Sequence, residues 1–175
     1  MAIRYCPYFC EENIWHLATD EHVIGKDRPI PASDRRVVFI SNARRWVAMR
    51  NQRAGGPRTI LWDYHVVLLA QGQVWDLEST LGFPIDLDRW IHGSFCPRYP
   101  DFAPRFRVID APTYRNSFAS DRSHMLGPGG LPRRPFPPWP RIGVGMNLPK
   151  FIDLETPYVG QVVDLDRLGR TEHLR

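Results

Sequence analysis

The chain has 175 residues, 43% of them hydrophobic and 12% aromatic, a composition typical of one globular domain with a sizeable core. Its net charge of +4 comes almost entirely from arginines spread along the chain, whereas nucleic-acid-binding proteins concentrate basic residues on one surface. Since no apolar run approaches the roughly 20 residues that cross a bilayer and no secretory signal begins the chain, we predict a cytoplasmic protein without nucleic-acid or membrane partners.

The chain contains an odd number of cysteines, Cys6, Cys10 and Cys96, which is typical of reduced thiols in the cytosol. Cys6 and Cys10 have a spacing found among zinc ligands, and His92 with Cys96 is the only pair that could complete such a site. Because these two pairs do not form a recognised ligand pattern, we predict no metal site.

Residues 10–18 predict a helix, because apolar side chains recur at i, i+3 and i+4 and acidic residues occupy the first turn. Cys10 then lies at the helix N-terminus, where the helix dipole favours the thiolate. Glu11 and Glu12 oppose this effect, so the sequence leaves the direction of the thiol pKa shift open.

The remaining patterns predict a central, mainly antiparallel sheet flanked by helices, in an α/β (α+β) fold of one domain over residues 1–175. Residues 127–140 are rich in proline and predict a rigid surface strap that packs Phe136 and Trp139, with recruitment of a proline-binding partner as an alternative. The expected elements are a strand at 36–42, a possible strand near 46–49, a loop at 53–57, strands at 62–69 and 73–77, a short helix at 83–91, a strand at 105–109, a helical turn at 146–152 and a closing strand or helix at 159–168.

The hairpin of residues 62–77 places a histidine and an aspartate close together. A two-residue turn pairs Ala70 with Gln73, and side-chain alternation then puts His65 and Asp76 diagonally on one face. A three-residue loop would put them on opposite faces, so the inference depends on the register.

The order Cys10, His65, Asp76 is that of a catalytic triad of thiol nucleophile, base and orienting carboxylate. For the thiol to reach the base, we expect the start of the N-terminal helix to pack across the hairpin face that bears His65. The alternative is structural, since a single buried cysteine is commonly a small apolar residue and a single strand histidine a satisfied core residue.

Four segments, residues 9–15, 38–42, 62–69 and 118–125, resemble the protein N-terminal glutamine amidohydrolase family in the same order. Shorter similarities occur at 76–78, 105–109, the proline-rich strap and 146–148, and the residues after 151 match poorly. Where the family tends to have a second aspartate two residues after the triad member, this chain has Glu78.

The resemblance implies a monomeric enzyme with a papain- and transglutaminase-like fold, whose triad falls on Cys10, His65 and Asp76. It implies conversion of an N-terminal glutamine of a protein or peptide to glutamate with release of ammonia, without a cofactor. Cys10 would form a thioester that water hydrolyses, with His65 as acid and base and the Cys10 backbone N–H as an oxyanion donor.

Selection of a free N-terminus calls for a buried carboxylate that pairs the α-ammonium group, because an internal glutamine would leave that carboxylate unpaired. The candidates are Glu12, Asp63 and Asp121, with Ser123 as a further substrate-binding residue. Their alternatives are a helix-start residue for Glu12, a structural hydrogen bond for Asp63 and a loop-anchoring pair for Ser123 and His124. We expect Trp15, Trp62 and Tyr64 in the core rather than in pocket walls.

Two other functions fit the same residues. The first is a cysteine protease or a transglutaminase-like acyltransferase with the same triad. The second is a non-catalytic module that binds N-terminal residues, in which replacing Cys10 would leave function untouched.

Overall fold

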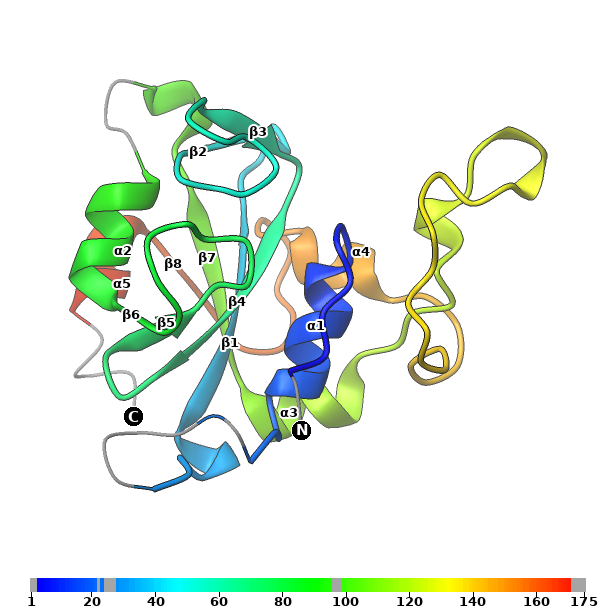
Figure 1. Ribbon diagram of the computed structural model, residues 1–175, viewed down its shortest axis with the longest axis horizontal. Helices are drawn as coiled ribbons and strands as arrows, with labels where there is room; N and C mark the ends of the chain where they lie inside the picture. Colours follow the sequence, from blue (N-terminus) through cyan, green and yellow to red (C-terminus); the bar gives the residue numbers. More distant parts are fainter. Residues whose placement is uncertain (1–2, 22, 24–27, 96–98, 171–175) are drawn as a thin grey trace.

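The computed structural model describes residues 3–21, 23, 28–95 and 99–170. Its centre is a six-stranded sheet with the order β6-β5-β4-β1-β7-β8, in which every neighbouring pair is antiparallel (Figure 1). In sheet order the strands are β6 (Ile85–Asp86), β5 (Gln73–Trp75), β4 (His65–Ala70), β1 (Arg35–Ser41), β7 (Arg105–Asp110) and β8 (Gln161–Val163).

Helices cover both faces of this sheet. One face carries α1 (Cys10–Leu17), α3 (Ala111–Ser117) and α4 (Leu148–Ile152), and the other carries α2 (Leu87–Ser94) and α5 (Leu165–Gly169) (Figure 1). Alternation along β1 builds both cores, since Val37 and Phe39 face the α1 layer and Val38 and Ile40 face the α2 layer. The predicted fold class and the N-terminal helix that carries Cys10 are confirmed, and the likeness to papain and transglutaminase stays a prediction.

The continuous strand predicted from residue 62 to residue 69 is wrong over its first part. The chain instead forms β3 (Ile60–Trp62), which pairs with β2 (Val47–Met49) in a separate two-stranded sheet, and β4 begins only at His65. The Asp63 carboxylate accepts a hydrogen bond from the Tyr64 N–H at 2.9 Å, and the Asp63 carbonyl accepts one from Ser41 at 2.7 Å. Local bonds of this kind replace ladder bonds and break the strand.

Other boundaries differ in detail. The segment predicted as a helix over 83–91 forms β6 followed by α2, because the Asp86 side chain accepts from the Arg89 N–H at 3.1 Å and fixes the helix start there. Helix α3 was not predicted, although Asp110 caps it in the same way through the Thr113 N–H. Short 3₁₀ helices occupy Ala32–Asp34, Pro100–Phe102, Ser123–Met125 and Pro128–Gly130.

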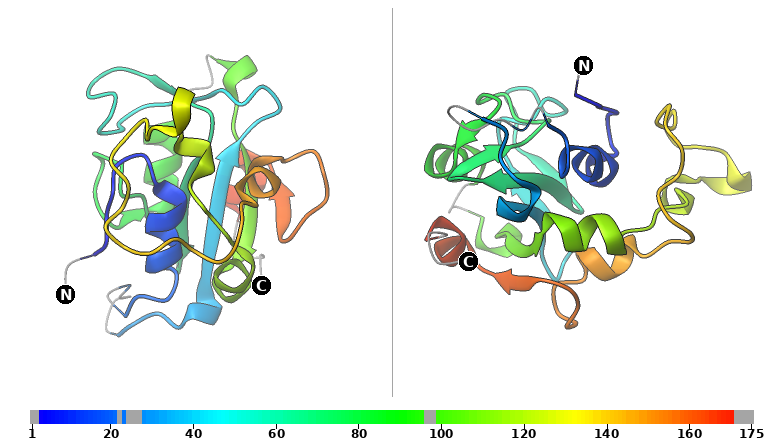
Figure 2. Two further views of the ribbon diagram at one scale, coloured as in Figure 1. Left: turned by 90° about the vertical axis from the view of Figure 1, so that its right-hand side faces the viewer. Right: turned by 90° about the horizontal axis from the view of Figure 1, so that it is seen from below.

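The proline-rich strap crosses the N-terminal helix. In the left view of Figure 2, the chain that follows α3 returns as a yellow segment in front of α1. Phe136 packs edge-on against Phe9 with the ring centroids 6.1 Å apart, and Trp139 packs edge-on against His16 with the centroids 5.0 Å apart. The predicted packing of both aromatic residues is confirmed. Among the helices in the described part of the chain, none has the length and apolar character of a membrane span.

Candidate active site

His65 and Asp76 contact each other directly in the interior. Strands β4 and β5 pair Ala70 with Gln73, the register expected for a two-residue turn, and this brings the two side chains together at the end of the hairpin. The His65 Nε2 lies 2.8 Å from the Asp76 Oδ1, and the two residues are 2% and 0% exposed. An ionised carboxylate only accepts hydrogen bonds, so it fixes the ring proton on Nε2 and leaves Nδ1 as the basic nitrogen.

Three further donors hold the Asp76 carboxylate. Gln52 Nε2 and Trp90 Nε1 donate to Oδ2 at 3.1 and 3.0 Å, and the Glu78 N–H donates to Oδ1 at 3.0 Å. Burial alone would raise the pKa of Asp76, but the attraction of His65 and these hydrogen bonds outweigh it and lower the pKa. Sequence reasoning missed Gln52, which lies in a loop, and treated Trp90 only as a core residue.

Cys10 is the first residue of α1 and packs against the core of the α1 layer. Its Sγ donates to the Glu11 Oε2 at 3.7 Å and also hydrogen-bonds the backbone of Val66, the residue that follows His65. Burial and the Glu11 carboxylate raise the pKa of the Cys10 thiol well above its ordinary value, and the Val66 bond only partly opposes them. Both effects favour the protonated form of the thiol.

The expected route by which the helix start meets the histidine is wrong. Val66 and Leu68 face α1, whereas Val67 and Leu69, which share the strand face of His65, belong to the α2 core. Cys10 instead approaches the first residues of β4, where it bonds the backbone of Val66. This part of β4 is not paired with β5 (Gln73–Trp75), because the ladder between the two strands starts only at Leu68.

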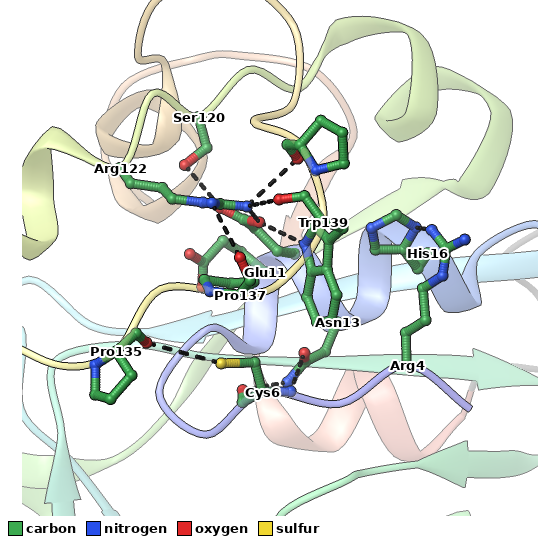
Figure 3. A network of polar contacts seen from close by, with 12 residues as sticks. Arg4, Cys6, Glu11, Asn13, His16, Ser120, Arg122, Pro135, Pro137 and Trp139 are labelled. Carbon is green, nitrogen blue, oxygen red and sulfur yellow. Dashed lines mark hydrogen bonds and ion pairs between the residues drawn. The ribbon is translucent and has the colours of Figure 1, made fainter. Parts of the chain in front are cut away.

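Glu12 is held in a buried ion pair. Arg122 donates to both of its carboxylate oxygens, at 2.9 and 2.8 Å, and Trp139 Nε1 donates to Oε2 at 2.8 Å. Figure 3 shows the Arg122 guanidinium beside Ser120 and the carbonyl groups of the strap. Since both oxygens of Glu12 have partners, this carboxylate fastens the strap to α1, as expected of a structural residue, rather than facing a substrate.

The other predicted substrate-binding residues serve local turns. Asp63 is exposed and caps the Tyr64 N–H, while Asp121 accepts a hydrogen bond from the Ser123 N–H at 2.9 Å. Hydrogen bonds from Ser123 lower the pKa of the Asp121 carboxyl. His124, the neighbour of Ser123, instead points inward, with its Nε2 3.4 Å from the Glu11 Oε1.

A cleft of about 220 Å³ is lined by Trp62 and Glu78, which contact His65 and Asp76 respectively. Trp62 packs against the α2-side core, as expected, and also forms one wall of the cleft, where it stacks on the His65 ring with the ring centroids 5.8 Å apart and the ring planes at 14°. Glu78, whose N–H bonds Asp76, forms another wall with only 7% of its surface exposed. The remaining lining residues are Tyr5, Pro7, Tyr8, Arg53 and Ala54.

Within the described ranges, no group of three histidine, cysteine or acidic side chains gathers closely enough to hold a metal ion. Cys6 and Cys10 are unpaired thiols there. Cys96 lies outside the described residues, and with it the alternative that pairs it with His92 in a zinc site.

A family model described as N-terminal glutamine amidase matches residues 5–171, so the chain belongs to this family and is a hydrolase that acts on an amide. The match extends well past residue 151, where the sequence similarity was expected to end.

Among relatives, the chain is similar to the protein N-terminal glutamine amidohydrolase of Homo sapiens, with 40% identity over 91% of this chain and 82% of the relative. Proteins of the same name from Danio rerio and Arabidopsis thaliana are 37% and 35% identical, over 89% and 85% of this chain and 81% and 74% of theirs.

Proposed function

We propose that this enzyme deamidates the side chain of an N-terminal glutamine to glutamate, with Cys10 as nucleophile, His65 as acid and base, and Asp76 as the orienting carboxylate. The observation that carries the proposal is the buried 2.8 Å contact between His65 Nε2 and Asp76 Oδ1. Family membership and the names of the relatives support the substrate.

In the acylation step, His65 Nδ1 accepts the Cys10 thiol proton as Sγ attacks the carbon of the substrate's side-chain amide. Burial and Glu11 raise the pKa of the thiol, so attack by Sγ calls for a base that takes the thiol proton. The tetrahedral intermediate collapses when His65 returns the proton to the amide nitrogen, so that ammonia leaves and a thioester to Cys10 remains.

In the deacylation step, His65 removes a proton from water, which attacks the thioester carbon and releases glutamate and the Cys10 thiol. Both tetrahedral intermediates carry an oxyanion that needs hydrogen-bond donors. The Cys10 N–H suits this role because it belongs to the first turn of α1 (Cys10–Leu17), and the N-cap residue Phe9 provides no side-chain cap in the described structure.

We further propose that residues 1–175 act as one catalytic domain, as a cytoplasmic monomer that needs no cofactor and binds neither nucleic acid nor membranes. Its partner is a protein or peptide with a free N-terminal glutamine. Asp76 is held by four donors, so the His65 ring is oriented before substrate arrives.

The test is mass spectrometry of peptides that begin with glutamine, asparagine or acetyl-glutamine after incubation with the protein. We expect the mass gain of amide-to-acid conversion, with ammonia release, on the free glutamine peptide alone. Cleavage of the peptide would indicate a protease, and amine incorporation an acyltransferase. The variant Cys10→Ala should abolish turnover while peptide binding survives, whereas an unchanged rate would refute the triad.

A further inference from the structure

The cleft that Trp62 and Glu78 line contains a carboxylate, that of Glu78, which the proposed mechanism does not use. We propose that Glu78 binds the α-ammonium group of the substrate's first residue in this cleft, so that only a chain with a free N-terminal amine is accepted. This inference rests on the proposed deamidation and identifies the recognition group that the sequence left open among Glu12, Asp63 and Asp121.

The position of Glu78 suits this role. Its side chain lines the cleft, yet the residue is only 7% exposed, so its charge is poorly solvated when the cleft is empty. The Tyr5 hydroxyl donates to Oε1, and the Glu78 N–H donates to Asp76. The Tyr5 bond holds the carboxylate and the backbone bond holds residue 78 beside Asp76, and an arriving ammonium group would add a charge-assisted hydrogen bond to the carboxylate.

The other carboxylates near Cys10 are less suited. Glu11 is fully buried, does not line the cleft and already accepts from Tyr64 at 2.9 Å. Glu12 has Arg122 on both oxygens. Asp63 is exposed, so an ammonium ion there would gain little over its interaction with water.

The same arrangement explains rejection of other glutamines. An internal or acetylated glutamine brings a neutral amide to the position of the ammonium group, which leaves the Glu78 charge desolvated and unpaired. The aromatic walls formed by Tyr5, Tyr8 and Trp62 offer apolar surface without sequence-specific groups, which suits a substrate defined by its first residue. Arg53 is exposed on the same cleft and can donate to carbonyl oxygens of the following peptide.

Amine binding would also affect the nucleophile. Burial raises the pKa of Cys10 most, followed by Glu11, and Asp63 and Glu78 raise it further. A bound ammonium ion neutralises the Glu78 contribution and thereby lowers the pKa of the thiol. The correct substrate would in this way help to activate the sulfur that attacks it.

The experiment compares kcat/KM for two peptides, one that begins with glutamine and one in which hydrogen replaces its α-amine. In the wild type we expect a preference for the free amine of roughly 100-fold or more, as for loss of one partner of a desolvated charge pair. In Glu78→Gln we expect the preference to fall to within a few-fold, mainly through slower turnover of the glutamine peptide. The matched control Glu155→Gln, on an exposed side chain paired with Arg105, should keep the full preference.

Binding separates a recognition role from a structural one. In a Cys10→Ala background, calorimetry should show that Glu78→Gln removes the difference in Kd between the two peptides, and Glu78→Asp should restore part of it. The assignment would be overturned if Glu78→Gln kept the full preference for the free amine, or if it weakened the binding of both peptides equally. If the wild type releases ammonia from neither peptide, the proposed function itself fails.

Discussion

Replacing Asp76 with asparagine tests whether the buried carboxylate holds the site together. The side chain accepts four hydrogen bonds, two on each oxygen. Asparagine keeps one accepting oxygen, which can still serve His65 and the Glu78 N–H. Its new NH₂ group then faces two donors, Gln52 Nε2 and Trp90 Nε1.

The cost follows from how these two donors can adapt. Gln52 can rotate its amide, because its Oε1 has no partner in the described structure and can accept from the new NH₂ group. Trp90 cannot adapt, so one buried donor is left unsatisfied at about 1–3 kcal/mol, and the loss of charge-assisted bonding brings the total to about 2–4 kcal/mol. For a chain of this size that corresponds to a fall in Tm of roughly 5–15 °C.

Urea unfolding followed by tryptophan fluorescence measures this change. Asp101→Asn, which removes an exposed ion pair with Arg44, is the matched control and should cost less than about 1 kcal/mol. Because the ring loses its orienting carboxylate, we also expect Asp76→Asn to lower kcat by about 10³-fold or more. A stability within about 0.5 kcal/mol of the wild type would refute the hydrogen-bond network as described.

Three other predictions concern charge and pH. The pKa of Asp76 is lowered in the folded state, so its contribution to the free energy of unfolding is complete above the unfolded value of about 3.9. Below that pH, the difference in the free energy of unfolding between wild type and Asp76→Asn should become smaller. Glu12→Gln breaks a buried ion pair and should lower the free energy of unfolding in urea by about 3–5 kcal/mol. A change as small as that of the exposed Glu155→Gln would contradict the role of Glu12 in holding the strap to α1. Burial and the nearby arginines lower the pKa of His16 to about 4, so the unfolded chain binds the proton first as the pH falls. The free energy of unfolding should therefore decrease between about pH 6.5 and about pH 4, and His16→Gln should weaken this pH dependence.

Much of the hairpin could be predicted because its information is local. The turn at residues 71–72 and the alternation of side chains fix the register, and the register alone brings His65 to Asp76. Helix α1 likewise begins at Cys10, as its periodicity and acidic first turn indicate. Such features depend on residues within one turn or one strand length of each other.

The surroundings of the pair could not be predicted, because they come from distant segments. Gln52 reaches Asp76 from a loop between β2 and β3, and Trp90 reaches it from α2, yet neither position carries a sequence pattern that separates a site residue from a loop or core residue. Glu12 shows the reverse case. The sequence made its acidic side chain a candidate for substrate binding, but in the fold it is paired with Arg122, which lies 110 positions away in sequence.

The Cys10 thiol shows that a sequence pattern can identify the groups that shift a pKa without giving the direction of the shift. A helix start lowers a thiol pKa and an adjacent carboxylate raises it, and the balance depends on where the Glu11 side chain points. In the folded chain its Oε2 lies 3.7 Å from Sγ in a buried setting, so burial and Glu11 prevail. The protonated form of the Cys10 thiol is therefore favoured in the folded chain, and Asp76 fixes the ring orientation of His65, the residue proposed to accept that proton.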